Sequence, residues 1–264
     1  MALSRLAGAY DYVMLDLDGC VWVGDALTPR AAPAIAALRD AGKPLAFITN
    51  DARHSGEEFV RKLWSLGVQA SLEEVVTVGG AIQHVLAERY AASRAVVIGA
   101  PPIHRHVQDA GLRIVNGTDF APRATVVVVA GHDGFDYAEL RDASLAARNG
   151  ADVLGACRDP TFPTPDGLWP GTGSIVAAVE IAGGVSAEII GKPMPQLFIT
   201  ALDRLGGGRA LFVGDRLDSD LGGATAAGID AAIVLTGATS AAEAEAADPK
   251  PVAVAPTLAD LLLA

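Results

Sequence analysis

The amino-acid sequence predicts an α/β protein whose core is a doubly wound parallel sheet, with a second α/β domain inserted into it. Short runs rich in Val, Ile and Leu alternate along the chain with longer amphipathic stretches, as strands and helices do in α/β folds. With 264 residues, 51% of them hydrophobic and 19% charged, the chain can bury one large core or a core that carries a sizeable insert. Polar residues follow the apolar runs near the two ends of the sequence but not those in its middle, which indicates the insertion.

The apolar runs have the length and composition of buried strands. They cover residues 12–17, 44–48, 95–98, 125–129, 152–154, 188–190, 210–213 and 231–235. Helical patterns lie between them, among others over residues 31–41, 56–66, 81–89, 137–149, 174–182 and 195–205. Because strand and helix alternate, the connections are long crossovers, which join parallel strands and cover the faces of the sheets with helices.

Polar side chains follow four of the expected strands, at the point where each strand ends. They are Asp16 and Asp18, then Thr49 and Asn50, then Lys192, and finally Asp215 and Asp220. Open parallel sheets bind ligands at this edge, so we expect these side chains to meet. The strands between about residues 79 and 187 carry no such set. We therefore expect a site-bearing core over residues 1–78 and 188–264, and an inserted domain over residues 79–187.

The segment Asp16-Leu17-Asp18-Gly19 places two carboxylates before a glycine that lets the chain turn away. One acid of such a pair can act as a nucleophile while the other donates and later abstracts a proton. The segment also has the opening of a calcium-binding loop, but the twelfth position from Asp16 is Leu27, where that loop needs Glu. A pair of acids in a surface turn stays open as an alternative.

Each of the other three segments has a functional and a structural interpretation. Thr49-Asn50 can donate hydrogen bonds to an anion, although Thr-Asn after a strand is commonly a turn and a helix cap. Lys192 follows a buried strand in a Gly-Lys-Pro triplet, and its structural alternative is an exposed loop lysine. Residues 214–220 contain three carboxylates, which suit Mg²⁺ or form a solvated acidic loop.

Taken in order, the four segments resemble the motifs of the haloacid dehalogenase superfamily. The matching residues are Asp16-x-Asp18-Gly19, Thr49-Asn50, Gly191-Lys192-Pro193 and Gly214-Asp215-x-x-x-x-Asp220. The resemblance is strongest to the superfamily's capped phosphatases, those similar to the N-acetylglucosamine-operon phosphatase (NagD-like), to p-nitrophenylphosphatases and to eukaryotic pyridoxal phosphate and phosphoglycolate phosphatases. It implies a Rossmann-like core with a large α/β cap of the C2 type, which residues 79–187 would form.

The resemblance also implies a role for each motif residue. Asp16 would be the nucleophile that forms an aspartyl-phosphate, and Asp18 the general acid and base. The phosphoryl group would be held by Gly19, Thr49, Asn50 and Lys192. Mg²⁺ would sit on Asp16, the backbone carbonyl of Asp18 and Asp215, with Asp220 orienting metal-bound water. The chemistry is consistent, because two anions approach each other only when cations such as Mg²⁺ and Lys192 neutralise them.

Three departures from the pattern of the branch concern the substrate. Asp51 stands where the branch usually has a second Asn, and this acid repels a phosphate unless it points away or pairs, for example with Arg53. The order Arg53-His54-Ser55 differs from the usual Ser-x-Arg-Ser, and Ala156-Cys157-Arg158-Asp159 replaces a common Thr-Asn-x-Asp. We expect the organic part of the substrate to meet residues of the inserted domain, each of which has a structural role as its alternative. They are His132, Asp133, Arg158 and Asp159.

The sequence therefore predicts a Mg²⁺-dependent phosphatase that hydrolyses a small phosphomonoester. Sugar phosphates, glycerol 3-phosphate, phosphoglycolate, pyridoxal phosphate and nucleoside monophosphates all stay open as substrates under the resemblance. The alternative is a non-catalytic, phospho-accepting switch, because receiver modules also place acids, a Thr and a Lys around Mg²⁺. Such modules need about half this length and give the insert no purpose.

Charge and hydropathy argue against nucleic acids and membranes as partners of this protein. Twenty Lys and Arg against 31 Asp and Glu give a net charge of −11, and no basic cluster offers a surface for nucleic acid. No apolar run approaches the roughly 20 residues of a membrane-spanning helix, and the first residues lack the apolar stretch of a signal peptide. Two cysteines without metal-ligand spacing fit a reducing cytoplasm. Related caps often dimerise, so a homodimer through the cap is a further expectation of the resemblance.

Overall fold

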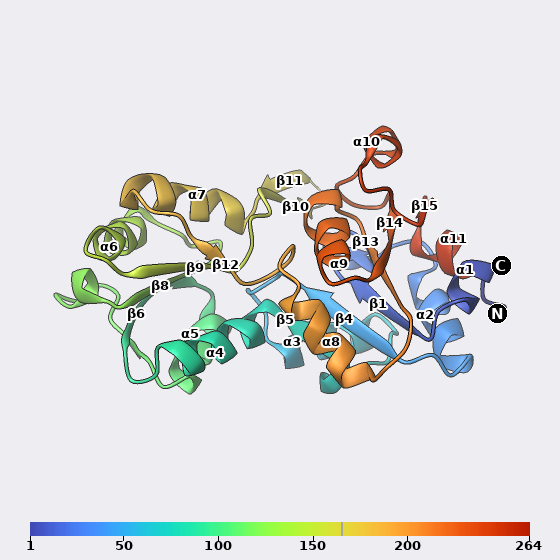
Figure 1. The fold of residues 1–264 in the computed structure, drawn as a ribbon, viewed down its shortest axis with the longest axis horizontal. Coiled ribbons are helices and arrows are strands. Elements are labelled where there is room, and N and C mark those ends of the chain that lie inside the picture. Colours follow the sequence, from blue (N-terminus) through green and yellow to red (C-terminus); the bar gives the residue numbers. More distant parts are fainter. Residues whose placement is uncertain (165) are drawn as a thin grey trace.

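The computed structural model describes residues 1–164 and 166–264, and its elements form two parallel sheets that lie beside each other along the long axis (Figure 1). The first sheet has the strand order β15-β14-β13-β1-β4-β5. Its strands are β1 (Tyr12–Asp16), β4 (Leu45–Thr49), β5 (Val75–Thr77), β13 (Ala210–Gly214), β14 (Asp230–Val234) and β15 (Ala253–Ala255). The chain fills the sheet from β1 toward one edge and later from β13 toward the other, so the strand order reverses between β1 and β13. This reversal is where open α/β sheets bind ligands.

Alternating side chains of the first sheet bury both of its faces. Val13 and Leu15 of β1 belong to a cluster that also contains apolar residues of α2, α3 and α11, whereas Met14 belongs to a cluster with residues of α8 and α9. The helices outside the second sheet are α1 (Arg5–Gly8), α2 (Ala31–Asp40), α3 (Gly56–Ser65), α8 (Gln196–Leu205), α9 (Gly222–Ala226), α10 (Ala241–Ala246) and α11 (Leu258–Leu262). Helices on both faces make this sheet doubly wound, as the sequence predicts.

The second sheet has the strand order β12-β9-β8-β6-β7, and all of its strands are parallel. Its strands are β6 (Arg94–Gly99), β7 (Arg113–Ile114), β8 (Val126–Gly131), β9 (Asp152–Gly155) and β12 (Glu188–Ile189). One face packs against α4 (Val78–Arg89) and α5 (Pro101–Asp109), and the other against α6 (Tyr137–Arg148) and α7 (Thr172–Gly183) (Figure 1). The buried cluster around α4 and α5 continues into the first sheet, so the two sheets share apolar packing.

Two hairpins and three short helical turns complete the described chain. The hairpins are β2 (Trp22–Val23) with β3 (Ala26–Leu27), and β10 (Thr161–Thr164) with β11 (Gly167–Pro170). The turns are η1 (Leu72–Glu74), η2 (Ala121–Arg123) and η3 (Leu217–Leu221). The hairpin β10–β11 lies between the two sheets in Figure 1, and the described helices include none long and apolar enough to cross a membrane.

One predicted strand joins a different sheet from the one that we expected. The run 188–190 forms β12, but Glu188 and Ile189 pair with Leu154 and Gly155 of β9, so this strand extends the second sheet. The placement of residues 188–190 in the core is therefore wrong, and the chain returns to the first sheet only after Ile190. A short apolar run fits the edge of either parallel sheet, and its sequence does not say which edge is free.

Candidate active site

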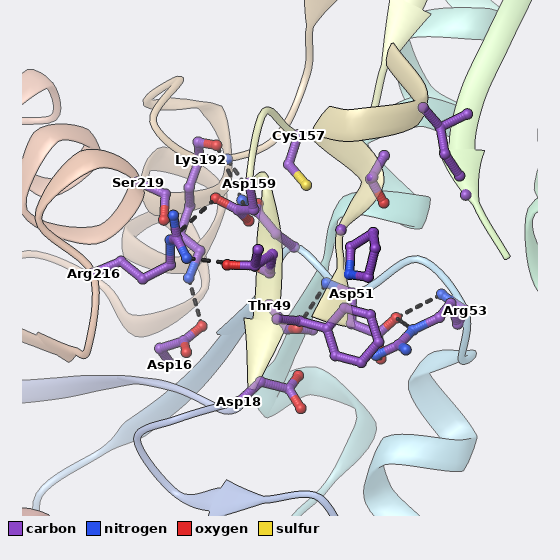
Figure 2. Close-up of a pocket in the computed structure, with 18 of the residues that line it drawn as sticks. Asp16, Asp18, Thr49, Asp51, Arg53, Cys157, Asp159, Lys192, Arg216 and Ser219 are labelled. Carbon is purple, nitrogen blue, oxygen red and sulfur yellow. Dashed lines mark hydrogen bonds and ion pairs between the residues drawn. The ribbon is translucent and has the colours of Figure 1, made fainter. Parts of the chain in front are cut away.

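The polar residues that follow three neighbouring strands meet at one edge of the first sheet. Asp16 is the last residue of β1, Thr49 is the last residue of β4, and Asp215 directly follows β13. All three line a cavity of about 110 Å³, which is also lined by residues that follow β8, β9 and β12 of the second sheet. Figure 2 shows Asp16 and Thr49 among the side chains that line this cavity. The predicted convergence at this edge is confirmed.

A buried lysine connects two of the acids. Nζ of Lys192 lies 2.5 Å from Oδ1 of Asp16 and 2.6 Å from Oδ1 of Asp220, and the side chain of Lys192 is only 3% exposed. Burial raises the pKa of Asp16 well above its usual value, although Lys192 opposes this shift. Burial lowers the pKa of Lys192, but the two carboxylates outweigh burial and raise that pKa. Lys192 therefore stays charged and is not an exposed loop lysine.

Asp215 has a carboxylate oxygen that the surrounding protein leaves without a partner. Its Oδ2 accepts a hydrogen bond from the backbone N–H of Ala238 at 2.6 Å, whereas its buried Oδ1 has no hydrogen-bond partner among the described residues. Burial and the charge of Asp220 raise the pKa of Asp215 to about 7. Oxygen atoms of Asp16, Asp215 and Asp220 all lie within 4.8 Å of one another. Three buried carboxylates and one lysine leave negative charge in excess, so this cluster fits a hard divalent cation such as Mg²⁺.

The position of Gly19 beside the acid cluster leaves no room for a side chain. Its φ is +89°, and a Cβ atom there would lie 2.5 Å from the carboxyl carbon of Asp215, so any side chain would collide with the acid. The N–H of Gly19 donates to the backbone carbonyl of Trp22 at 2.7 Å in this structure. The contact of Gly19 with the phosphoryl group stays a prediction.

Asp18 lies at the same cavity and is oriented by an indole. Nε1 of Trp22 donates a hydrogen bond to Oδ1 of Asp18 at 2.9 Å. Burial, followed by the charge of Asp51, raises the pKa of Asp18. This hydrogen bond holds one carboxyl oxygen of Asp18 and leaves the other for a proton transfer within the cavity.

Asn50 connects Lys192 to Asp159 across the cavity. Its Oδ1 accepts from the N–H of Lys192 at 2.8 Å, and its Nδ2 donates at 3.0 Å both to the carbonyl of Lys192 and to Oδ2 of Asp159. Both amide protons are thus hydrogen-bonded in this structure. Asn50 fixes the backbone of Lys192 and lines the cavity on the side of the second sheet, and its contact with a phosphate stays a prediction.

In and after the end of β4, the hydroxyl of Thr49 can donate to an anion, and the carboxylate of Asp51 is neutralised by its neighbours. Oγ1 of Thr49 accepts from the N–H of Asp51 at 2.9 Å, which leaves the hydroxyl proton of Thr49 available for an anion. Asp51 pairs with Arg53, whose Nε lies 2.9 Å from Oδ1, and with Nδ1 of His54 at 2.9 Å from Oδ2. The expected pairing of Asp51 with Arg53 is confirmed, and Figure 2 shows it.

Three of the four residues predicted to contact the organic part of a substrate line the cavity. His132 follows β8 with its Nε2 2.9 Å from both carboxylate oxygens of Glu139, and the exposed Asp133 comes next. Asp159 follows β9, and its Oδ1 lies 3.5 Å from Nε of Arg216.

Arg158 is the exception, because neighbouring residues of this extended segment point to opposite sides. Cys157 and Asp159 line the cavity, whereas Arg158 forms a two-pronged ion pair with Glu180 at 2.7 and 3.0 Å and lies outside the cavity. The prediction that Arg158 contacts substrate is wrong.

Replacing Arg158 by Ala is therefore expected to leave the preference among phosphate esters unchanged. The side chain is half-exposed, so losing its ion pair costs at most about 1 kcal/mol of unfolding free energy. The measurement is kcat/KM for several esters. Asp159→Asn is the comparison variant, and we expect it to change KM because Asp159 lines the cavity. A change of preference in Arg158→Ala alone would return this residue to the site.

The cavity is also lined by residues that the sequence reasoning did not single out, among them Phe162, Thr172, Arg216 and Ser219. Arg216 had a usable signal, since it follows Asp215 within the acidic segment and pairs with Asp218 at 2.8 Å. Phe162 lies in the hairpin β10–β11, where its ring lies 4.2 Å from the guanidinium carbon of Arg53. No long periodic pattern marks so short a hairpin.

Known proteins resemble this chain over most of its length. The family model described as haloacid dehalogenase-like hydrolase matches residues 13–113, and a second one, described as HAD-hydrolase-like, matches residues 189–261. The D-glycerol 3-phosphate phosphatase of Mycobacterium tuberculosis is 38% identical over 248 residues, which cover 94% of this chain and 69% of that protein. Human chronophin is 33% identical over 259 residues, with 93% and 88% of the two chains covered.

A solved structure gives the same relationship in three dimensions. The glycerol phosphate phosphatase from Mycobacterium tuberculosis, crystallised in complex with magnesium, superposes with a TM-score of 0.88 at 37% sequence identity. The superposition covers 98% of this chain and 78% of the other. Fold and sequence thus agree over both sheets, although the other chain is longer.

Proposed function

The chain belongs to the haloacid dehalogenase-like hydrolases and is a phosphatase, and we propose that it hydrolyses a small phosphomonoester through an aspartyl-phosphate on Asp16. The observation that carries this proposal is the buried cluster at the edge of the first sheet. Asp16, Asp215 and Asp220 gather around Lys192, and Oδ1 of Asp215 has no partner among the described residues. A phosphoryl-transfer site needs such a nucleophile between fixed cations.

The first step is an attack by a carboxylate oxygen of Asp16 on the phosphorus atom. A bond forms between phosphorus and Asp16 while the bond between phosphorus and the ester oxygen breaks. Asp18 donates its proton to the departing oxygen, and its Trp22 hydrogen bond keeps the carboxyl group oriented for this transfer. Lys192 and the hydroxyl of Thr49 bind the oxygens of the transferred group.

The second step releases phosphate from Asp16. A water molecule attacks phosphorus, the bond between phosphorus and Asp16 breaks, and Asp18 accepts the proton of the water. Asp18 thereby returns to its starting state, so one carboxyl group serves both steps. Asn50 takes no proton in this scheme, because it fixes the backbone of Lys192.

The residues that would hold Mg²⁺ are Asp16, Asp215 and Asp220, with the backbone carbonyl of Asp18. When bound, Mg²⁺ neutralises the charge that otherwise keeps a carboxylate and a phosphate apart. The magnesium complex of the Mycobacterium tuberculosis relative supports this choice of ion.

The second sheet and its helices act as the cap of the site in this proposal, with residues 79–187 as the inserted domain and the return strand β12 added at the edge of its sheet. The loops after β8 and β9 and the hairpin β10–β11 cover the cavity, so they exclude bulk water and contact the organic part of the substrate. Glycerol 3-phosphate is the leading substrate, because the relative named for it is 38% identical. We also propose a cytoplasmic location, which the two free, buried cysteines support; a homodimer through the cap stays a prediction.

Phosphate release from a panel of small phosphomonoesters tests the function. The panel contains glycerol 3-phosphate, sugar phosphates, phosphoglycolate, pyridoxal phosphate, nucleoside monophosphates and 4-nitrophenyl phosphate, each with Mg²⁺ and with EDTA. We expect turnover of glycerol 3-phosphate with kcat/KM above about 10⁴ M⁻¹s⁻¹ that EDTA abolishes. Turnover that persists in EDTA would contradict the metal site, and one stable phosphorylation per chain without turnover would favour the phospho-accepting switch.

A further inference from the structure

Each Lys, Arg and His side chain that lines the described part of the cavity lies beside a carboxylate. Lys192 pairs with Asp16 and Asp220 at the phosphate end. Away from that end the pairs are Arg53 with Asp51, Arg216 with Asp218 and Asp159, and His132 with Glu139. A second anionic group on a substrate would therefore find no unpaired Lys or Arg among the described residues that line the cavity.

Arg53 is held by Asp51 through both its side chain and its backbone. Its Nε and Nη2 lie 2.9 and 3.3 Å from the two oxygens of Asp51, and its backbone N–H donates to Asp51 at 2.8 Å. The guanidinium also lies over the ring of Phe162 at 4.2 Å, which fixes it against the hairpin β10–β11. Asp51 thus occupies the Nε–Nη2 edge of Arg53 and neutralises its charge, so a carboxylate at the remaining Nη1–Nη2 edge would meet a guanidinium that is already paired.

Asp51 is held in its charged form by its partners. Although burial raises its pKa, the hydrogen bond with His54 and the charge of Arg53 hold the pKa of Asp51 well below its usual range. At the mouth of the cavity the exposed Asp133 adds negative charge, and no cation lies within 4 Å of its carboxylate in the part of the chain that the structure describes. The wall around the organic part of a substrate is thus neutral to acidic.

Resting on the proposed function, we propose that Asp51 selects against phosphomonoesters that carry a carboxylate, so that the substrate is a phosphorylated polyol or sugar with an uncharged organic part. A substrate carboxylate would have to bind beside an Arg53 whose charge Asp51 already neutralises, or lie beside the negative charge of Asp133, and in both places it loses its hydration without gaining an unpaired counter-charge. Hydroxyl groups have no such difficulty, because they donate hydrogen bonds to carboxylates such as Asp133.

Glycerol 3-phosphate and 3-phosphoglycerate form a matched pair for the test, since a carboxylate in the second replaces a CH₂OH group in the first. We expect the wild-type enzyme to favour glycerol 3-phosphate at least about tenfold in kcat/KM. Asp51→Asn keeps the shape of the side chain but removes its charge, which leaves Arg53 for the substrate. The ratio of kcat/KM for 3-phosphoglycerate to that for glycerol 3-phosphate should then rise at least about tenfold.

Two further variants separate this effect from a general change in activity. In the double variant Asp51→Asn with Arg53→Gln the ratio should fall back, because the cation that receives the carboxylate is gone. His54→Gln removes another partner of Asp51, one that lies outside the cavity lining, and should leave the ratio unchanged. Thermal unfolding of each variant shows whether it is folded. The ratio of kcat/KM for the two esters in the wild-type enzyme tests the proposal without any substitution.

The same samples hydrolyse 4-nitrophenyl phosphate, and the two esters are also compared as competitive inhibitors of that reaction. Equal kcat/KM or equal inhibition constants for the two esters in the wild-type enzyme would overturn the selection against carboxylates. A folded Asp51→Asn variant with an unchanged ratio would overturn the role of Asp51. Neither result touches the proposed function, which instead fails if the wild-type enzyme hydrolyses no phosphomonoester at all.

Discussion

Replacing Asp16 by Asn is expected to lower kcat/KM for every phosphomonoester by at least about a thousandfold. An amide has no negative charge with which to attack phosphorus, so the aspartyl-phosphate cannot form. Asn has nearly the shape of Asp, and Lys192 keeps its second partner at 2.6 Å on Asp220. The variant should therefore fold, and phosphate release together with circular dichroism checks both statements.

Asp25→Asn is the matched control, because it makes the same chemical change on a side chain that is fully exposed. This variant should keep wild-type activity. Asp16→Asn with activity within about tenfold of the wild type would remove Asp16 as the nucleophile. The other acids of the cluster, Asp215 and Asp220, would then be the next candidates to replace.

Replacing Lys192 by Met is the substitution with the second-largest expected effect, and it acts on stability as well as on turnover. Lys192 is the buried cation that contacts Asp16 and Asp220. Removing one partner of a buried ion pair costs about 3–5 kcal/mol, because the remaining charges are left uncompensated. We expect the free energy of unfolding, measured with urea in EDTA, to fall by about 3 kcal/mol or more, and turnover to fall at least about a hundredfold.

Lys62→Met is the control for this substitution. Nζ of Lys62 donates to the carbonyl of Gly24 at 2.8 Å and lies over the ring of Trp22, outside the acid cluster. It should cost much less unfolding free energy than Lys192→Met. A Lys192→Met variant as stable in EDTA as the wild type would mean that the acids of the cluster need no buried cation.

The convergence of the site could be predicted from the sequence because it depends on topology. In parallel sheets the carboxyl ends of neighbouring strands share an edge, so Asp16, Thr49 and Asp215 meet wherever β1, β4 and β13 are neighbours. The alternation of apolar runs with amphipathic stretches was enough to predict those strands. The same pattern did not assign residues 188–190, because strand β12 fits the edge of either sheet.

What individual side chains do at the site was harder to predict, because it depends on partners from distant segments. Asn50 looks like an anion donor beside Thr49, yet its amide is used by Lys192 and Asp159, more than 100 residues away in sequence. Gly19 looks like part of a phosphate loop, yet its space is taken by Asp215. Neither contact leaves a local signal in the sequence.

Arg158 and Asp51 show how well the position of a single side chain can be predicted from the sequence. Cys157 and Asp159 face the cavity, whereas Arg158, which lies between them in sequence, does not. A shift of one residue in the expected register would reverse which side chains face the cavity. Asp51 was correctly expected to pair with Arg53, because a carboxylate so close to a phosphate site needs a counter-charge and an arginine lies two residues away.

The stereochemical course at phosphorus tests the central claim most directly. The measurement uses a phosphorothioate monoester whose phosphorus atom is made chiral with oxygen isotopes, and it determines the configuration of the thiophosphate that the wild-type enzyme releases. Two in-line displacements, first by Asp16 and then by water, each invert phosphorus, so the account predicts net retention. Net inversion would mean that water attacks the ester directly, and it would contradict an aspartyl-phosphate intermediate.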